Sequence, residues 1–126
     1  MVAGVCKPTL LCVDDNQTAL HVRKMVLETA GYSVLVASDP VTAMELFSKS
    51  EVDLVISDHF LQGSTGTELA AEMKRLKPDV PIAIISGALE PPDGMEHADL
   101  FICKTDSPPE VLRKISELLN RGGNGH

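Results

Sequence analysis

The sequence contains few positive charges, no long apolar run and no apolar segment in its first eight residues. Its 126 residues contain 11 Lys and Arg against 18 Asp and Glu, a formal net charge of −7. A polyanion would meet net repulsion, so direct nucleic-acid binding is not expected. No apolar run approaches the roughly 18 to 20 residues of a membrane span, and residues 1–8 lack the apolar segment of a secretion signal. We therefore expect no membrane insertion and a cytoplasmic location.

Paired cysteines are also missing. Cys6, Cys12 and Cys103 form no CxxC motif and have no histidine at zinc-finger spacing, so free thiols are expected. The remaining composition, 44% hydrophobic and 23% charged, is that of an ordinary globular protein. The length suits one domain. We predict a single domain over 1–126, with its core at 9–119 and a flexible, glycine-rich tail at 120–126.

Short apolar runs alternate with helical patterns along the chain. The runs, read as strands, cover residues 10–13, 34–36, 54–56, 82–85 and 100–103. Asn16 and Asp39 are predicted N-caps, and Thr65-x-x-Glu68 is typical of a capping box. In the first helix, an apolar face is predicted from the spacing of Ala19, Val22, Val26 and Ala30.

Five strands joined by helices require parallel pairing and right-handed crossovers. We predict an α/β fold, a flavodoxin-like doubly wound five-stranded parallel sheet in the order 2-1-3-4-5. The fourth crossover departs from this pattern. Pro91 and Pro92 exclude an interior helix, so the fourth helix is expected to be shortened or irregular, with at most one turn at 95–98.

Polar residues follow four of the predicted strands and would line one crevice at their carboxyl ends. They are Asp14 and Asp15, Asp58, Ser86, and Lys104. Three carboxylates sharing a partly buried site need a cation, and hard oxygen ligands around an open crevice suit Mg²⁺. A lysine beside that metal is useful if a negative group arrives, and a phosphoryl group has the oxygens that both cations prefer.

This acidic pair, central Asp, Ser and Lys, each in its strand-end context, resembles the receiver domains of response regulators in two-component signalling, over about residues 9–119. The resemblance implies that Asp58 is the phosphoacceptor and forms an aspartyl phosphate. The donor would be a histidine kinase or a phosphotransfer protein. Mg²⁺ would contact Asp15 and Asp58 directly, Asp14 through water, and the backbone carbonyl of Phe60.

The resemblance also implies a switch. Lys104 would pair with the carboxylate or the phosphoryl group, Ser86 would move to bond the phosphoryl group, and Phe101 would turn inward. Gly66 matches the glycine after the phosphoacceptor loop. The output would be altered binding of a downstream target protein. No external substrate would be turned over, so the chain would not be an enzyme in the ordinary sense.

Three features depart from the family pattern. Thr105 stands where a proline in a cis peptide bond usually follows the lysine, so a trans Lys104–Thr105 bond is predicted. Gln62 replaces a common proline, which favours a more mobile loop. The third departure is the short fourth crossover, on a face that receivers commonly use to meet partners.

Other functions fit the same residues less well. A receiver-like interaction domain that works without phosphorylation would explain the odd crossover and Thr105. A Mg²⁺-dependent phosphohydrolase with an Asp nucleophile often places a second Asp two positions later, where this chain has Phe60. A flavin-binding flavodoxin is disfavoured because Asp14 and Asp15 would repel a phosphate. Whether the chain works alone or belongs to a longer regulator stays open.

Overall fold

A central sheet and its helices occupy residues 7–123, the part of the chain that the computed structural model describes. The elements in chain order are β1 (Thr9–Val13), α1 (Gln17–Thr29), β2 (Ser33–Ala37), α2 (Pro40–Lys49), β3 (Leu54–Asp58), β4 (Phe60–Leu61), β5 (Ser64–Thr65), α3 (Gly66–Leu76), β6 (Ile82–Ser86), the 3-10 helix η1 (Met95–His97), β7 (Leu100–Cys103) and α4 (Pro108–Gly123). None of the described helices is both long and apolar enough to cross a membrane.

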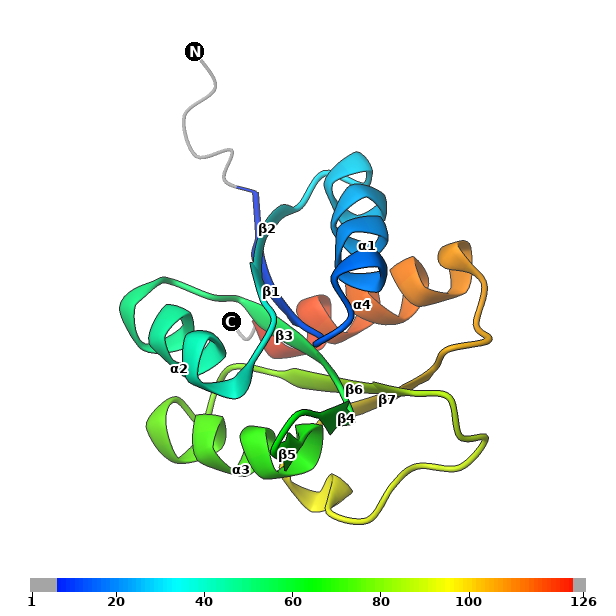
Figure 1. Ribbon diagram of the computed structural model, residues 1–126. Coiled ribbons are helices and arrows are strands. Elements are labelled where there is room, and N and C mark those ends of the chain that lie inside the picture. Colours follow the sequence, from blue (N-terminus) through cyan, green and yellow to red (C-terminus); the bar gives the residue numbers. More distant parts are fainter. Residues whose placement is uncertain (1–6, 124–126) are drawn as a thin grey trace.

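The main sheet has five parallel strands in the order β2-β1-β3-β6-β7 (Figure 1). This confirms the predicted doubly wound fold, with β6 and β7 as the fourth and fifth strands. The winding changes direction between β1 and β3, because β2 lies on one side of β1 and all later strands lie on the other. A ligand crevice is expected at the carboxyl ends of strands around that point.

Helices cover both faces of the sheet, with α2 and α3 on one side and α1 and α4 on the other (Figure 1). Successive residues of β1 enter opposite layers, since side chains alternate along a strand. Leu11 and Val13 pack with Phe47 and Met73 in one core, whereas Leu10 and Cys12 join the other. Both faces are therefore apolar, as a buried parallel sheet requires.

The described cysteines are free thiols, as predicted: Cys12 is buried and Cys103 half-buried. Burial raises the pKa of Cys12 to about 12, so this thiol stays protonated. Cys6 lies outside the described residues.

The predicted helix caps are confirmed. Asn16 accepts a hydrogen bond from the backbone N–H of Ala19, and Asp39 accepts one from Thr42. Thr65 and Glu68 form the reciprocal capping box at the start of α3. These side chains satisfy backbone donors that a helix leaves unpaired in its first turn.

The predicted apolar face of α1 is wrong. Val22 is 54% exposed, and the buried residues of the helix are Leu20 and Leu27. Arg23, only 14% exposed at its side chain, lies three residues after Leu20 and four before Leu27 and so belongs to the same face. The buried face was not recognised in the sequence because it contains this arginine, and a charged residue is expected to face solvent unless it is paired.

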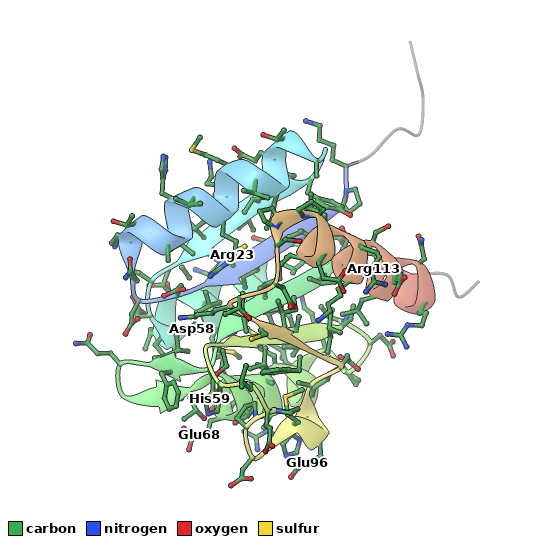
Figure 2. All side chains as sticks on the ribbon, turned by 90° about the vertical axis from the view of Figure 1, so that its right-hand side faces the viewer. Arg23, Asp58, His59, Glu68, Glu96 and Arg113 are labelled. Carbon is green, nitrogen blue, oxygen red and sulfur yellow. The ribbon has the colours of Figure 1, made fainter. Side chains whose placement is uncertain are left out.

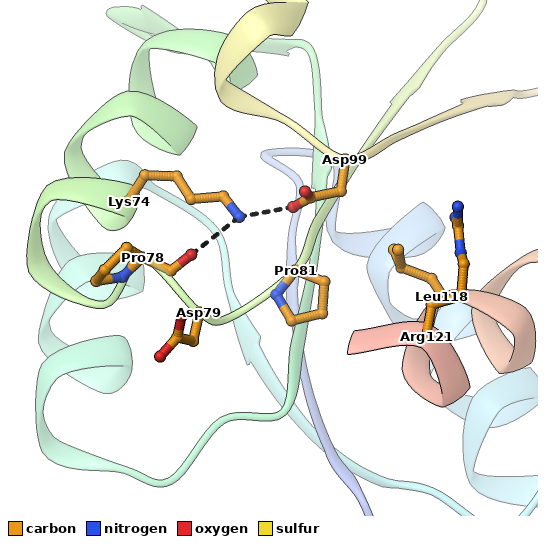
Figure 3. A pocket seen from close by; sticks show the side chains of 7 residues that line it. All are labelled: Lys74, Pro78, Asp79, Pro81, Asp99, Leu118 and Arg121. Atoms are coloured by element: carbon orange, nitrogen blue, oxygen red, sulfur yellow. Dashed lines mark hydrogen bonds and ion pairs between the residues drawn. The ribbon is translucent and has the colours of Figure 1, made fainter. Parts of the chain in front are cut away.

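The fourth crossover contains only the short 3-10 helix η1, as predicted. Asp99 holds the end of this crossover, since one of its oxygens accepts hydrogen bonds from Lys74 on α3 (2.7 Å) and from the backbone N–H of Ile82 (2.8 Å). Asp99 lies beside a cavity of about 350 Å³ at the amino ends of β6 and β7 (Figure 3). The cavity therefore lies at the opposite end of the sheet from Asp58.

Two details were not expected. β4 and β5 form a small antiparallel hairpin directly after β3, turning at Gln62 and Gly63, where Gly63 has a φ of 79°. The last helix continues to Gly123, so residues 120–123, predicted as tail, are helical. Glycine weakens a helix by about 1 kcal/mol relative to alanine but does not forbid it. Residues 124–126, the rest of the predicted tail, lie outside the described part.

Candidate functional site

The acidic pair lies in the loop that joins β1 to α1. Asp14 is 1% exposed, and one of its oxygens accepts a hydrogen bond from the backbone N–H of Asn16 at 2.9 Å. Asp15 is exposed. The N-cap of α1 at Asn16 thus fixes the loop and directs one carboxylate into the domain while the next stays open to solvent.

Asp58 is the last residue of the central strand β3 and is 5% exposed. Its Oδ1 lies 3.1 Å from Nζ of Lys104, which follows β7 on the far side of β6. The pKa of Asp58 is raised, chiefly by burial and further by the charge of Asp14; a hydrogen bond from Lys104 opposes the shift. The carboxyl is thus tuned by opposing influences from three strand ends.

The raised pKa of Asp58 predicts how stability depends on pH. The folded state holds the proton more tightly than the unfolded chain, whose pKa is near 3.8. The stabilising contribution of this group is therefore present below that pH and is lost as the pH rises through the folded pKa. Asn is neutral throughout, so we expect Asp58→Asn to raise the free energy of unfolding near neutral pH.

Urea unfolding at several pH values measures this effect, and the advantage of Asp58→Asn should shrink as the pH falls toward 3.8. Asp79→Asn, which removes a carboxylate from an exposed turn, is the matched control. A gain that is independent of pH would contradict the explanation.

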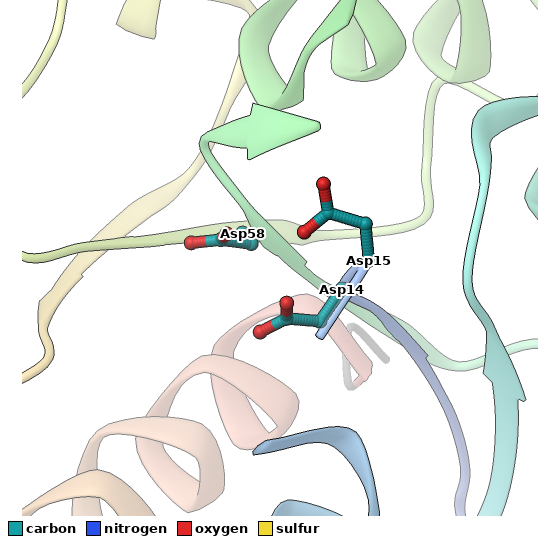
Figure 4. Close-up of side chains that lie close together, drawn as sticks. All are labelled: Asp14, Asp15 and Asp58. Atoms are coloured by element: carbon teal, nitrogen blue, oxygen red, sulfur yellow. The ribbon is translucent and has the colours of Figure 1, made fainter. Parts of the chain in front are cut away.

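Asp14, Asp15 and Asp58 meet in one cluster (Figure 4). Each offers a carboxylate oxygen, and these oxygens lie within 4.8 Å of one another. Three hard oxygen donors at such spacing, one of them open to solvent, fit a Mg²⁺ ion that keeps several waters. The structure thus brings together the three side chains that the sequence proposed as metal ligands.

Ser86 is the last residue of β6, and Lys104 follows the neighbouring strand β7. The backbone N–H of Lys104 donates to the carbonyl of Ser86 at 2.8 Å, which holds the two residues together at the edge of the sheet. The Ser86 side chain is 2% exposed, and its hydroxyl accepts a hydrogen bond from the backbone N–H of Ala88 at 3.2 Å. The hydroxyl is therefore engaged with the loop after β6.

The loop after Lys104 is held by Asp106. The described chain contains no cis peptide bond, so the Lys104–Thr105 bond is trans as predicted. Asp106 accepts hydrogen bonds from the backbone N–H of Cys103 (3.3 Å) and from Nζ of Lys114 on α4 (2.8 Å). The Lys114 hydrogen bond is the main cause of the lowered pKa of Asp106. Asp106 thus ties the turn that carries Lys104 to the last helix.

The two proposed phenylalanines differ in exposure. Phe60 begins β4, two residues after Asp58, and is 69% exposed. Phe101 is half-buried in β7, paired in register with Ile84. Between Asp58 and Phe60, the ring of His59 is 8% exposed and contacts Phe60 edge to face at 4.7 Å between centroids. Its Nδ1 has no hydrogen-bond partner among the described residues.

Sequence reasoning missed Arg23. Its Nη1 donates to the second oxygen of Asp14 at 3.2 Å. Figure 2 shows Arg23 beneath α1, on the side of Asp58. A usable signal was present, because helical spacing places Arg23 between Leu20 and Leu27, and a cation on a buried face needs an anionic partner.

Sequence comparison agrees with this geometry. The response regulator receiver domain family matches residues 10–116, and the chain belongs to this family. It is 34% identical over 123 residues to the phosphate regulon transcriptional regulatory protein PhoB of Pseudomonas aeruginosa, covering 93% of this chain and 54% of PhoB. Response regulator SaeR of Staphylococcus aureus is 29% identical over 116 residues, with 89% and 50% covered. The chain spans about half the length of these curated relatives.

Solved structures show the same fold. A CheY-like receiver domain protein from Methanospirillum hungatei superposes with a TM-score of 0.88 at 25% identity, over 96% of this chain and all of the other. The response regulator TrrA from Thermotoga maritima, solved in complex with Mg²⁺ and BeF, gives 0.83 at 26% identity, over 88% of this chain and 98% of TrrA. The five-stranded architecture is thus that of receiver domains.

Proposed function

We propose that this domain is a phosphorylation-controlled signalling module and that Asp58 accepts the phosphoryl group. The observation that carries the proposal is the pairing of a nearly buried Asp58 with Lys104 at 3.1 Å, beside two further carboxylates within 4.8 Å. A carboxylate in contact with one cation, and facing ligands for another, is suited to receive a group that adds negative charge.

In the proposed reaction, an oxygen of Asp58 attacks the phosphorus of the donor. A new O–P bond forms while the bond between phosphorus and the donor breaks, and its electron pair leaves with the donor. Lys104 neutralises charge on the transferred group. Asp14, Asp15, Asp58 and the carbonyl of Phe60 would hold Mg²⁺, which supplies charge stabilisation for the phosphoryl oxygens. The Mg²⁺ and BeF bound to TrrA support this assignment.

Release of Ser86 from its bond to the Ala88 backbone is the proposed start of the switch. The Ser86 hydroxyl would exchange the Ala88 N–H for a phosphoryl oxygen, and the loop after β6 would then rearrange. Phe101, half-buried on the neighbouring strand, would turn inward. Such a change would shift the domain toward the second of two arrangements, the one that the phosphoryl group stabilises.

The proposed partners are a histidine kinase or a phosphotransfer protein as donor and a downstream protein as target. PhoB and SaeR are named as regulators, which supports a place in two-component signalling. On this proposal the domain turns over no external substrate and only loses its own phosphoryl group slowly to water.

The decisive test is the mass of the intact protein after incubation with acetyl phosphate, with and without Mg²⁺. We expect one phosphoryl adduct that depends on Mg²⁺ and is absent from Asp58→Asn. An adduct of equal size on Asp58→Asn would place the modification elsewhere. If rapid quenching reveals no adduct on the native protein, a receiver-like domain that binds its partner without phosphorylation becomes the better function.

A further inference from the structure

Arg23 is a second cation of the acidic cluster, contributed by the buried face of α1. It hydrogen-bonds Asp14, whose side chain is 1% exposed, and is itself 14% exposed. Leu20 and Leu27, on the same face of α1, are buried. The guanidinium is therefore held beside the cluster by a packed helix and is not free to swing away into solvent.

The net charge of the cluster and its two cations depends on whether a metal and a phosphoryl group are bound. Asp14 pairs with Arg23 and Asp58 with Lys104, while Asp15 adds a third carboxylate. With all of these ionised, the sum is one negative charge, and a divalent metal alone would leave one excess positive charge. A phosphoryl group on Asp58 adds one negative charge and brings the metal-bound cluster to neutrality. Without Arg23, the neutral state would be the metal-bound cluster with no phosphoryl group.

We propose that Arg23 is a positioning residue that weakens binding of Mg²⁺ alone and favours the state that holds Mg²⁺ and a phosphoryl group together. This inference rests on the proposed function. Two physical effects act in the same direction. The guanidinium donates to one of the two carboxylate oxygens of Asp14, a member of the acidic cluster, and its charge repels the metal. The same charge attracts the anionic group that arrives at Asp58.

The test compares Arg23→Met with Lys24→Met by isothermal titration calorimetry. Methionine keeps an apolar stem of similar reach between Leu20 and Leu27, which limits the loss of packing. Lys24 is the matched control, because it is the next residue of α1 and pairs on the surface with Glu28 at 3.0 Å. The probes are Mg²⁺ alone and beryllofluoride in the presence of saturating Mg²⁺, where beryllofluoride stands for the phosphoryl group.

We expect Arg23→Met to bind Mg²⁺ about tenfold more tightly and beryllofluoride about tenfold more weakly than the native protein, as loss of one unit charge in a partly solvated site predicts. Lys24→Met should leave both affinities within about twofold. The opposite signs separate this role from a structural one, since a loosened site would bind both probes more weakly.

Arg23→Lys provides a second variant that keeps the charge and so protects the fold if Arg23→Met is unstable. Its affinities for both probes should stay within about threefold of the native values. The inference is overturned if Arg23→Met weakens both affinities or changes neither, or if Arg23→Lys shifts them as strongly as methionine. If the native protein binds neither probe, the proposed function itself fails, and the inference fails with it.

Discussion

Replacing Lys104 with methionine is expected to slow phosphorylation of Asp58 by acetyl phosphate about 100-fold. Removing one preorganised charge or donor from a reacting centre typically costs a factor of 10² to 10³. Lys104 lies 3.1 Å from Asp58, and the hydrogen bond between them lowers the pKa of that carboxyl against the effect of burial. The variant thus loses the charge that steadies the transferred group and keeps Asp58 protonated to a higher pH.

Intact-protein mass spectrometry over time measures the rate. Repeating it across pH separates the two effects, because a change in protonation is recovered at higher pH and the loss of charge stabilisation is not. Lys24→Met removes the same charge from the surface of α1 and should leave the rate unchanged. If Lys104→Met is phosphorylated at the native rate, Lys104 has no part in the reaction, despite its short distance from Asp58.

Gly66→Ala is expected to destabilise the domain by about 1 to 3 kcal/mol, the usual scale for overfilling a packed interior. A Cβ at this position would lie 2.5 Å from the carbonyl oxygen of Asp58 and 3.1 Å from Cα of His59. Both are backbone atoms, so no side chain is able to turn aside. The backbone N–H of Gly66 also donates to the carbonyl of His59 at 2.6 Å, which fixes this close approach.

Because the clash is with the backbone of Asp58, the proposed phosphoacceptor, we expect phosphorylation to slow as well. The chain has no Trp, so urea unfolding is best followed by circular dichroism. Gly87→Ala is the matched control, since its Cβ would meet nothing nearer than Cδ of Lys104 at 4.0 Å. Alanine is more favourable than glycine in a helix, so without the clash Gly66→Ala would not lower stability. Equal stability of the two variants would therefore contradict the close approach of Gly66 to the Asp58 backbone.

Two features explain how much of the fold was predictable from sequence. The strands are apolar on both faces, so each appears in the sequence as a short uninterrupted apolar run. At the start of α1, α2 and α3, the capping side chain bonds a backbone N–H only three residues later. Both signals are local. Parallel pairing then follows from the alternation of strands and helices, and the sheet order follows from resemblance to known domains.

The missed features depend on contacts between distant segments. The face of α1 was misjudged because Arg23 is buried only by virtue of Asp14, which comes from the end of β1. No sequence motif marks Asp106. Its role comes from its contacts with Lys114 on α4 and with the backbone of Cys103. Arg23 lies nine residues from Asp14, and Lys114 lies eight residues from Asp106. Helical spacing places Arg23 on the buried face of α1, but no local pattern shows which carboxylate it meets.

Local sequence patterns were enough to predict the doubly wound sheet, the helix starts, the irregular fourth crossover and the set of polar residues at the strand ends. Those properties arise from local periodicity and from the rule that parallel strands place their carboxyl ends at one edge. The contact of Lys104 with Asp58 was expected from the family resemblance alone, and the contact of Arg23 with Asp14 was not expected; both depend on how distant segments pack together. Such pairings form because burying a charge without a partner is costly, and which partner is in reach depends on how the helices pack.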